Sequence, residues 1–272
     1  MYSHGSTMLY FLVYVDDLLH TGNDQATLTW FQDFLSSRFS LKELGDVNYF
    51  LGIEVIPTST GYILSQHKYM VDVLQRFLMT DAKAVDTPLA ASTSLTLQDC
   101  SPPTDATRYR QALGALQYLV STRPDIAYSV NKLSQYMHAP SSSHWQCVKR
   151  LLRYVSGTLT CGLSIRRSNA PLRLSAFADS AWVGNLDDRS STSGYLVYFC
   201  STLISWRSQK QRTVARSIPR HNIVPLPMPP LNCNGCRNFS LSYAILYLLH
   251  LPSTPTISAP PTSAPIRSFI LA

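Results

Sequence analysis

Hydrophobic and polar positions alternate between strand-like and helix-like patterns over the first 79 residues. Apolar residues fill 8–15, stop at two aspartates and resume over 18–21, which predicts a β-hairpin. A helix is expected from about residue 24, because apolar residues then recur at the spacing of one helix face. These residues are Leu28, Phe31, Phe34, Leu35 and Phe39. A second hairpin over 49–66 and an amphipathic helix over 67–79 complete this mixed segment.

The middle of the chain has a different pattern. Residues 80–106 hold few large apolar side chains and contain three prolines, so we expect a linker there. Three helical patterns follow, near residues 106–121, 124–138 and 142–155. Pro124 suits the first turn of the second helix, and a run of serines can cap the third.

After Gly157 the periodicity changes to that of β-strands. The expected strands are 162–165, 172–178, 194–199 and 203–206. From about Ile218 the periodic pattern ends, and ten of the 17 prolines lie in residues 218–272. The apolar run Leu241 to Leu251 is too short to span a bilayer. We therefore expect residues 218–272 to be disordered.

The net charge of +7 arises in one part of the chain. Asp188 is the last acidic residue, and residues 189–272 hold eight lysines and arginines. Residues 1–188 are left with 15 basic and 16 acidic residues, a net charge of −1. A basic balance confined to the last third indicates lost acidic residues as readily as it indicates a nucleic-acid-binding surface.

The start of the chain and its cysteines favour a soluble protein in the cytoplasm or nucleus, with no targeting signal. The first apolar run ends at two aspartates, unlike a secretory signal. The six cysteines lie far apart, so free thiols are expected. Cys233 and Cys236 resemble half a zinc site, but no second ligand pair stands at a suitable spacing, and we expect a chance occurrence.

Tyr14-Val15-Asp16-Asp17 is the sharpest local motif. Two adjacent carboxylates at the tip of an apolar hairpin can hold Mg²⁺, whose oxygen ligands suit phosphoryl transfer. An ordinary acidic turn explains the same residues, because aspartate favours β-turns. The tetrapeptide alone leaves both interpretations open.

Longer motifs favour the metal-binding interpretation. The stretch from Leu12 to Gly22 is followed in order by Phe39 to Asp46, Tyr49 to Val55, Thr87-Pro88-Leu89, Thr122 to Tyr128, Asp187 to Ser190 and Ile204-Ser205-Trp206. In this order they closely resemble the reverse transcriptases of copia-type retrotransposon Pol polyproteins. The resemblance covers about residues 8–217.

The resemblance implies an α+β fold in five parts. These are a partial reverse transcriptase palm and thumb-like part over 1–79, a linker over 80–106, a helical connection over 107–160, a truncated RNase H-like domain over 161–217 and a disordered, out-of-frame tail over 218–272. Asp16 and Asp17 would be two of three palm carboxylates that bind catalytic Mg²⁺, and the hairpin over 49–66 would grip the primer. The implied partner is a primer-template or an RNA–DNA hybrid, with no membrane and no small-molecule cofactor, while the oligomeric state stays open.

Asp179 resembles the first catalytic and metal-binding carboxylate of RNase H. It lies in Ala178 to Gly184, where the family has Asp-Ala-Asp-Trp-Ala-Gly, and the second aspartate of that pattern aligns with Ala181. A single carboxylate cannot place two Mg²⁺ ions. Asp187 and Asp188 are expected in a solvated loop rather than as replacements.

Two interruptions are expected from the same resemblance. A family palm needs another aspartate on a strand before the hairpin, and only 15 residues precede Asp16. After Ser217 the family continues with Ser-Thr-Glu-Ala-Glu-Tyr-Arg, which this chain lacks. Codons for Pro219 to Phe239 can be chosen so that the neighbouring frame restores a family-like helix, so we expect a frameshift near Ser217. Genomic DNA without such a reading frame would exclude it.

The sequence therefore predicts a fragment of an RNA-directed DNA polymerase with the start of RNase H, as a catalytically inactive pseudogene product. The alternative is a non-catalytic nucleic-acid-binding protein derived from the transposon, which would use the hairpin over 49–66 and the helices over 106–155. An active polymerase or nuclease is disfavoured because each site lacks a carboxylate.

Overall fold

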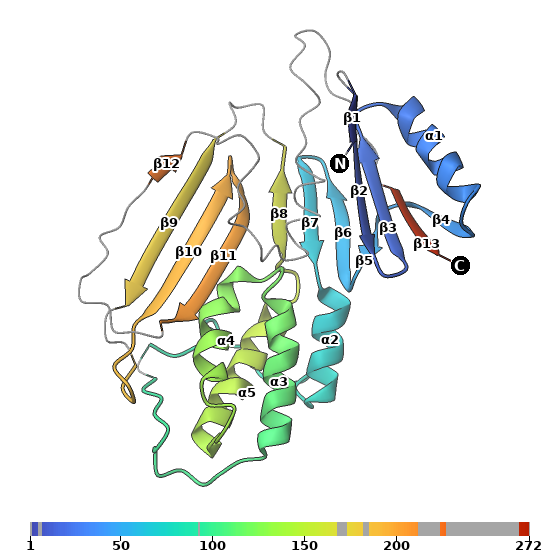
Figure 1. The fold of residues 1–272 in the computed structure, drawn as a ribbon. Helices are drawn as coiled ribbons and strands as arrows, with labels where there is room; N and C mark the ends of the chain where they lie inside the picture. The colour runs from blue at the N-terminus through green and yellow to red at the C-terminus, as the bar shows by residue number, and fades with distance from the viewer. Residues whose placement is uncertain are drawn as a thin grey trace.

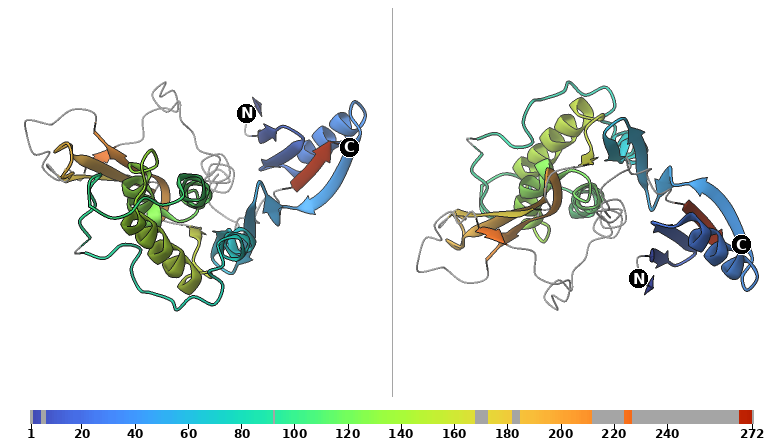
Figure 2. Two further views of the ribbon diagram at one scale, coloured as in Figure 1. Left: turned by 90° about the horizontal axis from the view of Figure 1, so that it is seen from below. Right: turned by 90° about the horizontal axis from the view of Figure 1, so that it is seen from above.

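Three antiparallel sheets and a group of helices make up the protein (Figure 1). The computed structural model describes residues 2–4, 7–91, 93–167, 173–181, 185–211, 224–226 and 267–271. Two of the sheets lie at opposite ends of the molecule in both views of Figure 2. The mixed α+β class expected from the sequence is confirmed.

The first sheet contains the hairpin with the two aspartates. Its strands run in the order β1 (Tyr2–His4), β2 (Thr7–Tyr14), β3 (Asp17–Gly22), β13 (Arg267–Leu271) and β4 (Leu41–Asp46). Helix α1 (Gln25–Ser36) connects β3 to β4 and lies against the sheet (Figure 1). Asp24 caps α1, because its carboxylate accepts a hydrogen bond from the Thr27 amide at 2.9 Å.

The predicted apolar face of α1 was wrong in part. Leu28 and Leu35 are buried, but Phe34 and Phe39 are 44% and 54% exposed. Phe34 instead belongs to a stripe on the outer side, where it stacks on Trp30 with ring centroids 5.8 Å apart. Residues four apart are neighbours on a helix, so this stripe competes with the inner one for the same periodic signal.

The second sheet confirms the second predicted hairpin. It consists of β5 (Tyr49–Phe50), β6 (Ile53–Thr58), β7 (Gly61–Ser65) and β8 (Leu163–Arg166), in that order. Strand β8 pairs with β7, although the sequence assigned it to the later RNase H-like segment. Leu163 and Ile165 alternate into the core of this sheet, where they meet Ile53, Val55 and Leu64. The hydrophobic pairing thus joins segments a hundred residues apart.

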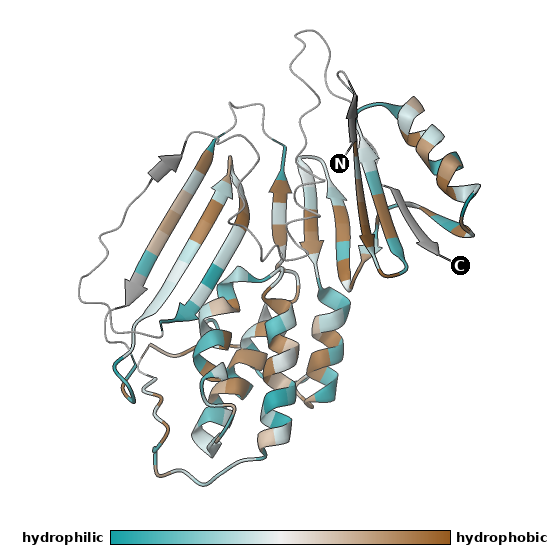
Figure 3. Cartoon of the chain, in the orientation of Figure 1, coloured by the Kyte–Doolittle hydropathy of each residue, from teal (hydrophilic) through white to brown (hydrophobic). Residues whose placement is uncertain are grey.

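Four α-helices form the largest core. They are α2 (His67–Arg76), α3 (Ala106–Leu119), α4 (Ala127–Ser134) and α5 (Ser142–Gly157), with a 3₁₀ turn at Pro124–Ile126 before α4. Apolar positions line the inner faces of these helices, as the brown bands in Figure 3 show. The predicted helices are confirmed with changed bounds: α2 ends at Arg76 rather than residue 79, and the helix predicted over 124–138 begins as the 3₁₀ turn and ends with α4 at Ser134. Leu95 of the expected linker is also buried in this core.

The third sheet has the order β11 (Thr202–Lys210), β10 (Thr192–Phe199), β9 (Leu174–Ala181) and β12 (Val224–Leu226). Strands β9, β10 and β11 correspond to the strands predicted over 172–178, 194–199 and 203–206. Residue 172 lies outside the described residues. The Trp206 indole N–H donates to the carbonyl oxygen of Val120 at 3.0 Å. This bond ties β11 to the end of α3.

Two described pieces of the last segment differ from the expected disorder. Strand β12 pairs with β9, and β13 pairs with both β3 and β4. The remaining residues after Gln211, which include Cys233, Cys236 and the apolar run Leu241 to Leu251, lie outside the described residues. Within the described part of the chain, no helix is long and apolar enough to cross a membrane.

Candidate functional site

Asp16 and Asp17 lie at the tip of the β2–β3 hairpin. The strand register pairs Tyr14 with Asp17, so Val15 and Asp16 form a two-residue loop. Asp16 is exposed and Asp17 is half-buried. The predicted hairpin is confirmed, but its turn is Val15-Asp16 rather than the expected Asp16-Asp17, and Asp17 is the first residue of β3.

Val15 adopts a backbone conformation that is unusual for its side chain. Its φ of 52° lies in the left-handed region, where a β-branched residue costs on the order of 1–3 kcal/mol. Two-residue hairpin loops require positive φ because their twist must match that of the strands. The Val15 side chain is 75% exposed, so core packing does not offset this cost.

Three exposed tyrosines and a lysine lie near this hairpin; we call Tyr14, Tyr49, Lys68 and Tyr118 the tyrosine surface. The tyrosines are 48%, 51% and 38% exposed, respectively. The Lys68 ammonium lies 5.6 Å from the centroid of the Tyr49 ring, in a cation–π contact. Burial raises the pKa of Tyr118, and the neighbouring hydroxyls of Tyr49, Tyr69 and Tyr14 add to the shift. Tyr14, Tyr49 and Tyr69 are therefore each close enough to Tyr118 to influence its ionisation.

The β5–β6 turn is held by a hydrogen bond from the helical core. Leu51 and Gly52 both have positive φ, of 48° and 75°. The Tyr118 hydroxyl on α3 donates to the carbonyl oxygen of Leu51. A Cβ atom added at Gly52 would lie 2.7 Å from the Tyr118 hydroxyl oxygen, so this approach requires glycine.

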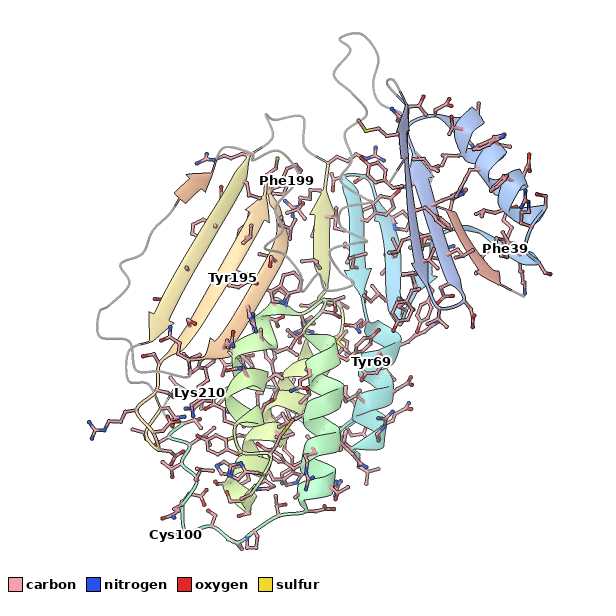
Figure 4. The ribbon with its side chains drawn as sticks, viewed as in Figure 1. Phe39, Tyr69, Cys100, Tyr195, Phe199 and Lys210 are labelled. Carbon is pink, nitrogen blue, oxygen red and sulfur yellow. The ribbon has the colours of Figure 1, made fainter. Side chains whose placement is uncertain are left out.

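Tyr69 of α2 packs against the ring of Tyr118. The two rings meet edge to face with centroids 4.9 Å apart. The Tyr69 hydroxyl donates to the carbonyl oxygen of Ala115 on α3 at 3.3 Å. Tyr69 is labelled near the start of α2 in Figure 4. Two helices thus fix the tyrosine that holds the turn.

Asp179 lies on β9, opposite Gly194 of β10. It is exposed and borders a cavity of about 650 Å³ between the third sheet and the start of α4. Four aromatic side chains and one arginine are among the residues that line it. They are Tyr128, Phe177, Tyr195, Trp206 and Arg207; Tyr195 is labelled on β10 in Figure 4.

The rest of the Asp179 motif is described only in part. Ala181, which aligns with a family aspartate, is at the end of β9 opposite Thr192. Residues 182–184 lie outside the described residues. The register therefore places Asp179 and Ala181 two positions apart on the same strand.

Asp187 and Asp188 hold the loop before β10. Asp187 accepts a hydrogen bond from the Leu97 amide at 2.9 Å. Asp188 pairs with Lys210 and accepts from Ser190, and these contacts lower the pKa of Asp188 to about 2. Both aspartates are exposed, in agreement with the solvated loop that the sequence predicted.

The predicted metal ligands lie in two separate places, as expected for residues assigned to two different domains. Asp16 and Asp17 lie in the first sheet, and Asp179 lies in the third, at the other end of the molecule (Figure 2). Among the residues that the structure describes, no group of three or more His, Cys, Asp or Glu side chains could share a metal ion. Two-ion phosphoryl transfer needs a larger set of oxygen ligands than either place offers. These residues therefore do not fit a two-Mg²⁺ centre.

Sequence reasoning missed a polar cluster inside the helical core. Arg123, 1% exposed, forms an ion pair with Asp125 at 2.7 Å. Its guanidinium also donates to the carbonyl and hydroxyl oxygens of Thr158, while the Tyr154 hydroxyl donates to Asp125. Burial opposes ionisation of Asp125, but Arg123 holds the pKa of this carboxyl below its usual value. Both residues lie in the family-like motif Thr122 to Tyr128, and their opposite charges stand two residues apart around Pro124.

Comparison with known proteins finds similarity to reverse transcriptases and retrotransposon Pol polyproteins. Residues 1–91 match a family model described as reverse transcriptase (RNA-dependent DNA polymerase). The chain is 49% identical over 213 residues to the retrovirus-related Pol polyproteins from transposons RE2 and RE1 of Arabidopsis thaliana. These matches cover 78% of this chain but only 15% and 14% of the two polyproteins.

A shorter relative matches along most of its length. An uncharacterized mitochondrial protein of Arabidopsis thaliana is 43% identical over 209 residues, which is 77% of this chain and 86% of that protein. No solved structure matches the chain.

Proposed function

This chain belongs to the reverse transcriptase family of copia-type retrotransposon Pol polyproteins, and from that membership we propose that it is a catalytically silent piece of such a polyprotein. The observation that carries the proposal is the arrangement of the carboxylates. Asp16 and Asp17 place two carboxylates, which can act as metal ligands, at the tip of a hairpin. Within the described residues, no third acidic side chain joins them.

The strand across from Asp17 supports this proposal. Ile270 of β13 is the residue paired with Asp17 in the neighbouring strand. An apolar residue at that position supplies no oxygen ligand, so the two aspartates alone would bind a divalent ion weakly.

We also assign strands β9, β10 and β11 to the start of an RNase H-like domain. The antiparallel order β11-β10-β9, with Asp179 on β9, supports the assignment. Ala181 stands where the family has its next aspartate, and Asp187 and Asp188 are engaged elsewhere in the loop. The nuclease site is therefore silent for the same reason as the polymerase site.

Activity assays on the full chain test the proposal. Purified protein is given a primer-template, nucleotides and Mg²⁺ for extension, and a labelled RNA–DNA hybrid for cleavage. We expect wild-type protein to match Asp17→Asn in extension and Asp179→Asn in cleavage, all at background. Extension lost in Asp17→Asn, or cleavage lost in Asp179→Asn, would overturn it.

The tyrosine surface favours a second candidate, a non-catalytic nucleic-acid-binding function. Exposed aromatic rings beside a cation can stack on unpaired bases and attract phosphates. Stacking contributes about 1–3 kcal/mol per base, so Tyr49→Ala should weaken binding roughly fivefold or more. Fluorescence anisotropy with a labelled primer-template at low salt measures this change.

Matched variants separate this surface from general charge. Lys68→Ala should reduce both the affinity and its salt dependence, whereas Lys83→Ala, at an exposed position outside the hairpin and the helices over 106–155, should change the affinity much less. Trp30→Ala is the control for an exposed aromatic ring on α1. Equal losses in all four variants, or no binding at low salt, would exclude the tyrosine surface as a binding site.

A further inference from the structure

The end of the chain fills a gap in the sheet formed by its beginning. Strand β13 lies between β3 and β4 and is antiparallel to both (Figure 1, red). On one side its register runs from Arg267 opposite His20 to Ile270 opposite Asp17. On the other side, β13 pairs with β4 along the whole length of β13. The other strands of this sheet all come from the first 46 residues.

Strands β3 and β4 are held in place by local structure. Strand β3 is half of the β2–β3 hairpin, and α1 carries the chain from β3 to β4. The Gln32 side chain of α1 donates to the Glu43 carboxylate of β4 at 2.8 Å. These contacts hold β3 and β4 with room for one strand between them. Neighbouring strands lie about 4.8 Å apart, so the separation of β3 and β4 is about 10 Å.

An open gap of this width would leave two rows of backbone groups unpaired. Each flanking strand would present free N–H and C=O groups toward the other, a template for pairing with any extended chain. A strand inserted there completes two ladders at once. Most of the recognition is by backbone hydrogen bonds, so the occupant needs an extended conformation more than a particular sequence.

We propose that the gap between β3 and β4 is an acceptor site for one extended peptide strand, and that residues 267–271 of the same chain occupy it as a displaceable insert. The segment Arg267-Ser268-Phe269-Ile270-Leu271 is rich in aromatic and branched apolar residues, which favour strands. It contains no proline, although proline is frequent just before it.

Covalent linkage favours this occupant over a second copy of the chain. Forty residues, 227–266, connect the end of β12 to β13. Because the segment belongs to the same chain, its insertion is intramolecular, at an effective concentration on the order of millimolar. A second copy at micromolar concentration competes poorly with such a tethered strand.

Cysteine cross-linking in the full chain tests the position. Lys42 and Ile270 are opposite each other in the β4–β13 register. Directly paired residues have Cα atoms about 4.5–5.5 Å apart, within the range that a disulfide spans. Under mild oxidation the double variant Lys42→Cys with Ile270→Cys should form an intramolecular disulfide. The control Lys42→Cys with Ser268→Cys is two residues out of register and should form much less.

The product distinguishes the possible occupants. A faster-migrating monomer on a non-reducing gel supports insertion of the chain's own segment. A cross-linked dimer would show that a second copy supplies the strand, and equal yields in both double variants would show that no defined register exists; either result overturns the proposal.

Strand exchange tests whether the site accepts a peptide. In the full chain, Phe269→Pro removes a backbone donor and should expel the segment from the sheet. A labelled peptide of residues 263–272 should bind this variant at least tenfold more tightly than wild-type protein. Ser263→Pro, outside β13, is the matched control and should behave as wild type. Equal binding to variant and wild type, or binding to neither, contradicts an acceptor site, and the disulfide result does not depend on the folding of the proline variant.

Discussion

The hydroxyl of Tyr118, near the end of α3, donates a hydrogen bond to the backbone carbonyl oxygen of Leu51 in the β5–β6 turn. The two residues are 67 positions apart and belong to different expected parts of the chain. Their contact makes the helical core a support for the hairpin that the family resemblance assigns to gripping a primer. Part of the chain that the sequence treated as a separate connection therefore shapes the tyrosine surface.

Loss of the Tyr118 hydroxyl should loosen this turn. Tyr118→Phe removes one hydrogen bond, which costs about 1 kcal/mol in the free energy of unfolding. Urea denaturation measures the change, and Tyr128→Phe, at a side chain 53% exposed, is the control. A Tyr118→Phe protein as stable as the control would refute the support role.

Gly52→Ala should be more damaging than Tyr118→Phe. The added Cβ meets the Tyr118 hydroxyl at 2.7 Å, and φ of 75° is unfavourable for alanine. Combining the two substitutions should relieve part of the clash, so the double variant should lose less stability than the sum of the single losses. Strict additivity in urea denaturation would contradict the contact.

The Arg123–Asp125 pair should be a large single contributor to the stability of the helical core. Asp125→Asn leaves the guanidinium of Arg123 buried without its anion, at a cost of about 3 kcal/mol, the lower end of the range for buried pairs. The lower end applies because the Asp125 side chain is 36% exposed. Replacing both residues, as Arg123→Met with Asp125→Leu, should restore most of the loss. If the double variant is less stable than Asp125→Asn, the charge argument fails.

Acid should weaken the start of α5. Hydrogen bonds from Ser143 and Ser141 hold the pKa of Asp99 to about 2. A lowered folded-state pKa contributes stability that is present above the unfolded value, near 4, and is lost as the pH falls through about 2. The stability difference between wild type and Asp99→Asn should therefore shrink between pH 4 and pH 2. A constant difference in urea denaturation at pH 5, 3 and 2 would rule out this linkage.

Local sequence patterns predicted most helices and strands, but they did not predict which distant strands pair with each other. The hairpin that carries Asp16 and Asp17 and the helix around Val148 follow from periodicity and turn residues close in sequence. The partner of β8 does not, because Leu163 reads equally well as the first strand of a following sheet. Phe34 misled the prediction of α1 because an aromatic stripe on the outer face has the same spacing as a core stripe.

The candidate sites were predictable only residue by residue. The sequence located Asp16, Asp17 and Asp179 and assigned the first pair and Asp179 to different domains, but it did not show what faces each of them in the folded sheets. The sequence also did not predict strand β13, because its pairing with β3 and β4 depends on a gap that only the folded sheet defines. The roles of these aspartates as metal ligands stay predictions.

Mn²⁺ binding to the full chain tests the central claim most directly, because it reports on the carboxylates without requiring catalysis. The signal of free Mn²⁺ in electron paramagnetic resonance gives the affinity, since bound ion loses that signal. We predict that wild-type protein, Asp17→Asn and Asp179→Asn bind Mn²⁺ equally weakly, with no site tighter than millimolar. A micromolar site in the wild-type protein that disappears in Asp17→Asn would contradict the account, because it would show that this chain completes a metal centre around the hairpin.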